Sequence, residues 1–394
     1  MRWASTASLA PHLEGAVAEA SAVLRGQLAD ARPDLIVAFA SEHYADEFDR
    51  IPDLIQAHLP AGLLIGCSAG GVIGGGREIE QRPGFSLTAA VLPGVELVPF
   101  HLDGTDLPTG SSAPGLTERL GVPATTQPHF VLLADPFSFD PEPLLHAIDR
   151  SYPHSHKIGG LASGGQHPGA NALFLGPQVH RSGLVGVALS GNVDVDTIVA
   201  QGCRPVGQPM FVTKHHDNII WELDGRGAID VLQELFEELS PADQELARGS
   251  LFLGIAMTGD RQEYRQGDFL IRNLVGIDAT RGAIALGAVL HENEIVQFHL
   301  RDAHTSAQDL EQLLNRYAAD RHEVRPAGGL LFSCLGRGAY LYGRPDHDTD
   351  AVRRLLGDVP LGGFFCNGEI GPVHGTTFLH GYTSAFGLFR SRGT

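Results

Sequence analysis

One pattern occurs three times along the chain and constrains its fold more than any other feature. An uninterrupted apolar run is followed by a helical stretch and then by a second apolar run rich in glycine. Apolar runs of this kind are typical of strands buried on both faces of a parallel sheet. We therefore expect three related βαβ-like units, each directing its glycine-rich strand end at a common crevice. Their strands, helices and second strands are expected at 35–40, 45–58 and 63–71; at 129–134, 141–151 and 157–165; and at 329–334, near 349–357 and in GGFFCNGEIG at 362–371, where residues 364–366 suit a short buried strand.

The segment between the second and third copies has a different pattern of apolar residues. Apolar stretches interrupted by glycine predict antiparallel strands there. Residues 228–239 predict a helix, and Ser240-Pro241 fits the start of another helix. The expected fold class is α/β, with two domains built from βαβ-like repeated units, mixed sheets and flanking helices. We divide the chain into residues 1–225 and 226–394. Further strands are expected at 184–189, 193–200, 210–213, 269–273, 283–288 and 295–300, and further helices at 8–30 and 305–317.

Charge and composition exclude several classes of partner. The 394 residues contain 46 acids against 28 bases, for a net charge of -18, which argues against nucleic acid and anionic membranes as partners. No stretch is apolar and long enough to predict a transmembrane helix, and Pro11, His12 and Glu14 interrupt any secretory signal. The four cysteines form no CxxC pair and no disulfide framework. We expect a soluble, cytoplasmic protein.

Two glycine-rich stretches are candidate binding loops. GCSAGGVIGGG, from Gly66, lacks the lysine of a phosphate loop and is not a GxGxxG fingerprint. Its successive N–H groups favour the wall of a small-molecule pocket that holds a carboxylate or carbonyl oxygen, and close strand–helix packing is the alternative. LGGFFCNGEIGP, from Leu361, places Glu369 just past an apolar strand, where open α/β sheets present ligand-binding groups. A tight turn with a solvated Glu369 is the alternative there.

The cysteines and histidines are weaker candidates for a catalytic or metal-binding site. Cys67 and Cys366 each stand where a strand meets a glycine turn, but no histidine at local spacing marks a catalytic dyad. Free cysteine is more often a small buried hydrophobe. The histidine pairs at 154/156 and 215/216 lack every metal motif, so we expect no metal site. A lone axial histidine for haem needs no spacing motif, so the residues alone neither support nor exclude haem.

Arg272, Asn273 and Arg337 are stronger candidates. Arg272 and Asn273 interrupt an apolar strand, and Arg337 follows another strand end between glycines. A guanidinium in such a place costs free energy unless it meets a carboxylate, a phosphate or a ligand. With Glu369 these residues predict a pocket matched to a zwitterion such as an amino acid. In the alternative reading, Glu369 pairs with one of the arginines and only ties strands together.

Six motifs in this order resemble the FIST family, whose FIST N and FIST C parts would cover nearly the whole chain. The motifs are GCSAGG at 66–71, QGCRPVG at 201–207, IRNLVGIDATRGAIALG at 271–287, VQFHLRDA at 296–303, LLFSCLGRG at 330–338 and GFFCNGEIGP at 363–372. The resemblance implies a sensory module of signal transduction that binds small ligands such as amino acids. A subset of the family resembles this chain in length and is described as haem proteins that sense nitric oxide and regulate partner histidine kinases.

We therefore expect a stand-alone sensor, not an enzyme, that binds a small polar ligand in a cleft between its domains. Arg272 and Arg337 would hold an anionic group, and Asn367 and Glu369 a cationic or donor group. No cofactor is expected. The alternative functions are a haem-based nitric oxide sensor and a cysteine-dependent enzyme. The signal would pass to a separate partner protein such as a histidine kinase. The candidate ligand-binding residues, in or beside the positions that carry the family pattern, are Gly66, Cys67, Ser68, Gly70, Cys203, Arg204, Arg272, Asn273, Cys334, Arg337, Cys366, Asn367 and Glu369.

Overall fold

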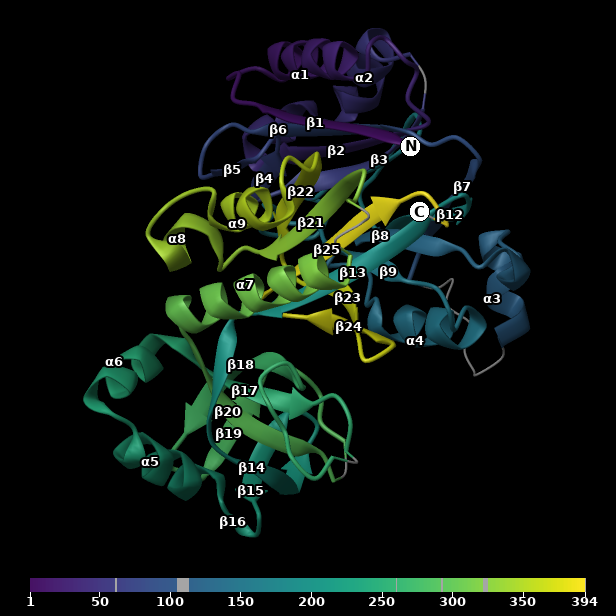
Figure 1. Cartoon of the computed structure of the whole chain (residues 1–394). Coiled ribbons are helices and arrows are strands. Elements are labelled where there is room, and N and C mark those ends of the chain that lie inside the picture. The colour runs from purple at the N-terminus through teal and green to yellow at the C-terminus, as the bar shows by residue number, and fades with distance from the viewer. Residues whose placement is uncertain (61, 105–112, 260, 292, 322–324, 394) are drawn as a thin grey trace. The chain divides into compact units, whose positions relative to one another are not determined.

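The computed structural model describes residues 1–60, 62–104, 113–259, 261–291, 293–321 and 325–393 (Figure 1). The chain forms two compact units. The first unit contains residues 1–199, 311–379 and 383–394, and the second contains residues 200–310 and 380–382. The division expected at 225/226 follows the order of the motifs and falls within the second unit. Among the helices of the described chain, none is long and apolar enough to cross a membrane.

Three six-stranded sheets make up the first unit. The first sheet runs in the order β1 (Arg2–Ser8), β6 (Phe85–Val91), β2 (Leu35–Ser41), β3 (Leu63–Ala69), β10 (Leu173–Leu175) and β11 (Gln178–His180). The second runs β24 (Thr376–His380), β23 (Glu369–Val373), β9 (Lys157–Leu161), β8 (His129–Ala134), β12 (Leu184–Gly191) and β7 (Val95–Leu102). The third runs β13 (Asp194–Gln201), β25 (Thr383–Arg390), β21 (Gly328–Cys334), β22 (Leu361–Cys366), β4 (Gly71–Gly74) and β5 (Arg77–Glu80).

The three predicted βαβ-like units are confirmed, and each contributes one parallel strand pair to a different sheet. These pairs are β2–β3, β8–β9 and β21–β22. The segments between the paired strands contain the 3-10 helix η1 (Glu42–Arg50) with α2 (Ile51–His58), then α4 (Glu142–Ser151), then α8 (Gly338–Tyr342) with α9 (His347–Leu356). The expected mixed α/β class is therefore correct.

A close approach of two backbones recurs in the three parallel pairs and explains one glycine in each. A Cβ added to Gly66 would lie 1.9 Å from the carbonyl oxygen of its register partner Ala38. The corresponding distances are 1.8 Å from Gly159 to Leu132 and 1.9 Å from Gly363 to Leu331, again between register partners. No side chain fits at such a distance. Gly66 is therefore required by the close approach of two strands, whereas the alternative considered from the sequence was close strand–helix packing.

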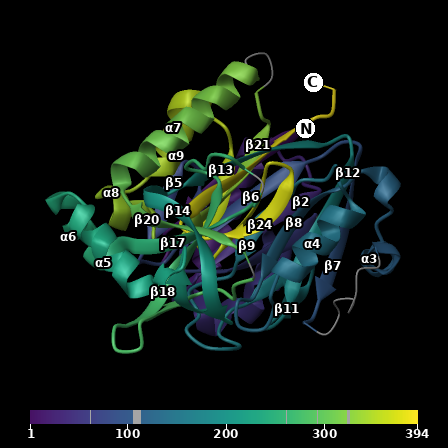
Figure 2. The same ribbon diagram turned by 90° about the horizontal axis from the view of Figure 1, so that it is seen from below.

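The central core of the first unit is shared by its three sheets. Successive side chains of a strand point to opposite faces. In β2, Val37 and Phe39 join the central cluster, whereas Ile36 and Ala38 face the cluster under α1 (Leu13–Gln27) and α2 (Figure 1). Phe39 stacks on Phe364 of β22 with ring centroids 4.6 Å apart. On the second sheet, α3 (Ala113–Leu120) and α4 pack beside each other (Figure 2). The η2 turn (Ala124–Thr126) precedes β8.

The second unit is built on one seven-stranded sheet, which an additional β14–β15 pairing closes on itself. The predicted helix at 228–239 is confirmed as α5 (Ala228–Glu238). Ser240 caps the next helix, α6 (Pro241–Ser250), by accepting a hydrogen bond from the Asp243 N–H. Both helices contribute to the apolar core beneath the sheet. The order is β14 (Cys203–His216), β20 (Ile295–Arg301), β17 (Leu251–Ala256), β18 (Phe269–Asp278), β19 (Ala283–Leu286), β15 (Ile219–Leu223) and β16 (Arg226–Gly227), and α7 (Ala303–Asp320) follows β20.

Candidate ligand-binding site

The carboxyl ends of the three repeats meet in the first unit around Ser163. This residue follows β9, and its buried hydroxyl donates a hydrogen bond to the carbonyl of Phe365 in β22. The same oxygen accepts a hydrogen bond from the N–H of Gly70, which follows β3, at 2.8 Å. A further hydrogen bond runs from Asn367 Nδ2 to the carbonyl of Ala162 at 3.2 Å. The common meeting point predicted for the glycine-rich strand ends is therefore present.

A buried polar wall stands beside this junction. Ser68 Oγ donates to Asn171 Oδ1 at 3.2 Å and accepts from the N–H of Ala172 at 3.1 Å. Asn171 Oδ1 also accepts from the N–H of Gly165 at 2.9 Å, and Asn171 Nδ2 donates to Asp135 Oδ1 at 3.0 Å. Ser68, Asn171 and Asp135 are all buried. Because each is held by these bonds, the wall is preorganised.

A pocket of about 280 Å³ lies between this wall and η1. Glu42 and Ala45 of η1 are exposed, whereas the Phe48 ring is buried. A volume of this size is at the lower end of the range for small-molecule sites. The carboxyl ends of parallel strands in an α/β sheet are the usual position for such a site. The lining residues are Glu42, Ala45, Phe48, Ser68, Ser163, Gly164, Gly165, Gln166, His167 and Ala170.

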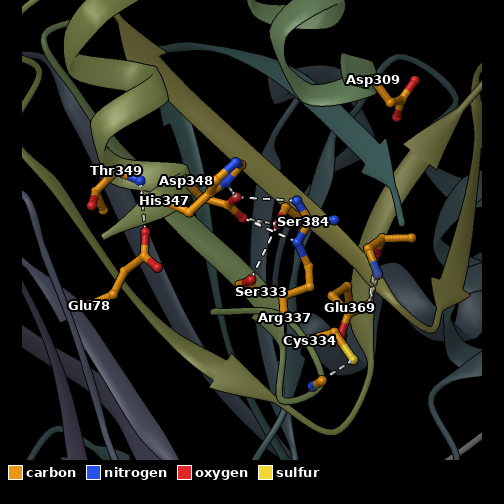
Figure 3. Close-up of polar contacts among 12 residues, drawn as sticks. Glu78, Asp309, Ser333, Cys334, Arg337, His347, Asp348, Thr349, Glu369 and Ser384 are labelled. Atoms are coloured by element: carbon orange, nitrogen blue, oxygen red, sulfur yellow. Dashed lines mark hydrogen bonds and ion pairs between the residues drawn. The ribbon is translucent and has the colours of Figure 1, made fainter. Parts of the chain in front are cut away.

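Arg337 is fully buried and forms an ion pair within the protein. Its Nε and Nη2 each lie 3.2 Å from an oxygen of Asp348, a bidentate pair (Figure 3). Asp348 also accepts hydrogen bonds from Ser384 and from His347, whose Nδ1 lies at 2.8 Å. The Arg337 guanidinium lies 5.5 Å from the ring centroid of Tyr342. We call these five residues, Arg337, Tyr342, His347, Asp348 and Ser384, the Arg337 network.

The network keeps both buried charges ionised. Burial opposes ionisation of Asp348, but the Arg337 guanidinium and the hydrogen bonds from its neighbours hold the pKa of this carboxyl below its usual range. Burial likewise disfavours the charged guanidinium, and Asp348 more than compensates, so the pKa of Arg337 is raised. A bidentate pair of this kind is a strong, geometrically specific interaction. Its chemistry therefore favours a structural role for Arg337, and its role as an anion ligand stays a prediction.

Glu369 is a buried carboxyl with a different set of partners. Its Oε2 accepts hydrogen bonds from the N–H and Oγ1 of Thr383, at 3.0 and 2.8 Å. Its Oε1 lies 3.5 Å from the Sγ of Cys366, which donates to it. Burial raises the pKa of Glu369 to about 7, although these hydrogen bonds oppose the shift. The solvated turn considered for Glu369 is therefore excluded, and the residue ties β23 to β25.

The candidate cysteines differ in exposure. Cys67 and Cys366 are fully buried in the central core, and burial raises the pKa of both thiols well above the usual value. Because the thiolate is the nucleophile, this environment disfavours catalysis by either residue. Cys334 is only partly buried, and its Sγ accepts a hydrogen bond from the N–H of Gly336 at 3.4 Å. None of the four cysteines forms a disulfide.

Four candidate residues lie in the second unit. Cys203 is buried in a small aromatic cluster, and Arg204 pairs with Asp243 and with Asp302, the latter at 3.5 Å. Asn273 accepts a hydrogen bond from the Tyr382 hydroxyl. Arg272 is half-buried in β18, and its Nη1 donates to the carbonyl of Ile271 at 3.3 Å. A shared anion held by Arg272 and Arg337 would involve both units and stays a prediction.

Sequence reasoning missed most of the residues that build the pocket. Ser163 and Asp135 follow the strands of the second repeat, and Glu42 follows the first strand of the first repeat. Their position just past a strand end was the available signal, since ligand-binding groups of α/β folds stand there. Asn171 lies in a loop whose sequence gave no signal. Of the predicted set, Ser68 lines the pocket, while Gly70 and Asn367 are tied to the junction beside it.

Haem, the cofactor of the alternative function, does not fit this pocket. A macrocycle held by an axial histidine needs a ring nitrogen that faces the cavity. His167, the histidine in the lining, is exposed, and its Nδ1 lies 3.1 Å from the carbonyl oxygen of Pro168, a contact that leaves Nε2 unoccupied. The size of the pocket is what disfavours haem, because a volume of about 280 Å³ is at the lower end for small ligands. Within the described ranges, no group of three or more His, Cys, Asp or Glu side chains is placed to hold a metal ion.

Comparisons with known proteins cover almost the whole chain. A model of the FIST N domain matches residues 34–226, and a model of the FIST C domain matches residues 228–372. An uncharacterized protein of Mycobacterium tuberculosis is 40% identical over 389 residues, which cover 99% of this chain and 100% of that protein. An uncharacterized protein of Mycobacterium bovis is 36% identical over 379 residues, 96% of each chain. Human F-box only protein 22 is 28% identical over 146 residues, 37% of this chain and 33% of that protein.

Proposed function

This chain belongs to the FIST family, and we propose that it is a sensor that binds a small polar metabolite in the pocket between η1 and the ends of β3 and β9. FIST domains indicate a sensory or signal-transduction role. The observation that carries the proposal is the convergence of three repeated strand ends on Ser163, beside a pocket with a preorganised polar wall. A preorganised site loses less free energy on binding, because its groups are already ordered.

The same junction offers a route from ligand to output. Ser163 lines the pocket and also bonds to Gly70 after β3 and to Phe365 of β22, so it connects strands of three sheets. A ligand that favours one arrangement of this junction shifts the population of states only by its differential affinity for them. We propose that a separate signalling protein, such as a histidine kinase, reads this shift. Four cysteines without a disulfide are in keeping with a reducing compartment such as the cytoplasm.

A thermal-shift screen of small metabolites tests the proposal. A ligand at 100 times its Kd stabilises the folded protein by about 2.7 kcal/mol, which raises the melting temperature measurably. Ala45→Trp should abolish the shift, because Ala45 lines the pocket and is exposed, so a large side chain there blocks the site at little cost to folding. His43→Trp is the matched control, since His43 is exposed in the same helix outside the pocket lining. A shift retained in Ala45→Trp would reject this pocket as the site.

A further inference from the structure

The two buried polar side chains of the lining, Ser68 and Ser163, present hydrogen-bond acceptors to the pocket, whereas Gln166 and His167 are exposed. A serine hydroxyl has one proton to donate and two lone pairs that accept. The Ser68 proton is directed to Asn171 Oδ1 and the Ser163 proton to the Phe365 carbonyl. Each oxygen also accepts one backbone N–H, from Ala172 and Gly70 respectively. One lone pair on each hydroxyl therefore remains for a ligand, and it can only accept.

The formal charge of the lining has one sign. Glu42 is the single carboxylate among the ten lining residues, and none of the ten is lysine or arginine. Its side chain starts at the pocket wall, since its Cβ lies 3.1 Å from the place of a Cβ added to Gly164. Arg181 lies 5.9 Å from the Phe48 ring centroid, but its guanidinium is paired with Asp49 at 2.8 Å. A ligand cation thus finds a partner among the lining side chains, and a ligand anion finds no lysine or arginine there.

Apolar surface accompanies these acceptors. Ala45, Phe48 and Ala170 line the same pocket. A ligand that combines a donor group with a short hydrocarbon part matches both kinds of surface. A volume of about 280 Å³ limits that ligand to a small molecule.

On the basis of the proposed function, we propose that the pocket selects a small primary amine in its protonated form. The ammonium group donates to the hydroxyl oxygens of Ser68 and Ser163 and is attracted by the Glu42 carboxylate, while the hydrocarbon part contacts Phe48. This narrows the ligand expected from the sequence, a zwitterion held by arginines, to one whose ammonium group determines affinity. A carboxylate on the ligand is not required for binding.

The test uses matched amino-acid derivatives as probes on the full chain. L-phenylalanine and L-alanine are each compared with their carboxamides, which keep the ammonium but lose the carboxylate, and with their N-acetyl forms, which lose the ammonium. Binding is measured by titration calorimetry below the pKa of the amines. We expect at least one carboxamide to bind as tightly as its free amino acid, and the N-acetyl form to bind at least about tenfold more weakly, because buried acceptors would lose their donors.

Two substitutions in η1 test the contribution of the Glu42 charge to binding, apart from any effect on folding. Glu42→Gln should weaken binding of the carboxamide about threefold, the effect of an exposed charge pair, and should not weaken binding of the N-acetyl form, which has no ammonium group. Asp46→Asn removes the same charge from an exposed position of η1 outside the pocket lining and should have no effect. Equal affinity for the N-acetyl form, with binding still lost in Ala45→Trp, overturns the amine inference and leaves the pocket assignment standing. Absence of binding by all six compounds also overturns the inference, whereas the broader metabolite screen decides on the proposed function.

Discussion

The pocket and the Arg337 network are two polar regions of the first unit, and both adjoin strand ends of the repeats. In the Arg337 network, a buried cation and a buried anion satisfy each other through a bidentate pair. In the pocket, the buried hydroxyls of Ser68 and Ser163 are neutral, their protons are donated to Asn171 and Phe365, and lone pairs remain beside a cavity. A charged residue in a motif therefore marks a buried interaction as readily as a binding site. What distinguishes a site is the hydrogen-bonding capacity that remains next to open space.

The largest effect is expected from breaking the buried pair on one side. Asp348→Asn leaves the Arg337 guanidinium buried without its counter-charge, which should lower the free energy of unfolding by about 3–5 kcal/mol. Urea denaturation measures this loss. The double substitution Arg337→Met with Asp348→Leu removes both charges and should cost less than Asp348→Asn alone. A loss below about 1 kcal/mol in Asp348→Asn would contradict a structural role for the network.

A pH dependence is expected from Glu369, whose pKa is raised to about 7 by burial. The folded protein holds this proton more tightly than the unfolded chain, in which the ordinary value is 4.5. The resulting stabilisation is complete below that ordinary value and is lost as the pH rises through about 7, a change of up to about 3 kcal/mol. Denaturation midpoints from acidic to mildly alkaline pH should fall more steeply in the wild type than in Glu369→Gln.

Glu78 is a second source of the same pH dependence. It is buried and accepts a hydrogen bond from the Thr349 N–H at 2.8 Å (Figure 3). Burial, followed by repulsion from Asp348, raises its pKa to about 8. Glu78→Gln should therefore flatten the profile between the ordinary value of 4.5 and about pH 8, whereas Glu369→Gln flattens it only between 4.5 and about pH 7. Parallel profiles for the wild type and both variants would rule out these assignments.

A smaller effect is expected at the junction of strand ends. Ser163→Ala leaves the Gly70 N–H and the Phe365 carbonyl without their side-chain partner and should lower the free energy of unfolding by about 1–3 kcal/mol. Ser155→Ala is the matched control, because Ser155 Oγ is buried and has no hydrogen-bond partner among the described residues. Equal losses in the two variants would show that the Ser163 bonds do not hold the junction together.

The smallest perturbation is chemical labelling of the native cysteines. Cys334 is partly buried, whereas Cys67, Cys203 and Cys366 are buried. A thiol reagent under native conditions should modify Cys334 first, and modification of the other three should require denaturation. Mass spectrometry of digested protein identifies the labelled position. Rapid labelling of Cys67 or Cys366 under native conditions would instead support the alternative hypothesis of a cysteine-dependent enzyme.

The sequence predicts the repeated strands well, because each is a short apolar run bounded by turn residues. The strand expected at 129–134 is observed as His129–Ala134, and the one at 329–334 as Gly328–Cys334. The first helix, expected at 8–30, is observed as Leu13–Gln27, because Arg2–Ser8 forms an edge strand instead of a helical lead-in. Periodicity reports which residues are buried, and burial is what these elements share.

The site was harder to predict because partners are set by tertiary contacts. Nothing in the sequence pairs Arg337 with Asp348 in preference to Glu369, since the choice depends on how α9 packs beside α8 and β5. Similarly, Asn171 acquires its role from two distant residues, Ser68 and Asp135. The motif residues identified the correct strand ends. The acceptors that the pocket presents depend on the tertiary hydrogen bonds of Ser68 and Ser163, which no local sequence pattern specifies.

Amide hydrogen exchange with and without the best ligand of the metabolite screen tests the central claim most directly, because it reads the two regions in one experiment. Ligand in the pocket should slow exchange at short labelling times in peptides covering 42–48 and 163–170, which contain most of the lining. Peptides covering 337–348, in the Arg337 network, should be unchanged at those times. Protection at 337–348 or 271–273, with none at 163–170, would place the ligand on the arginines and contradict the account.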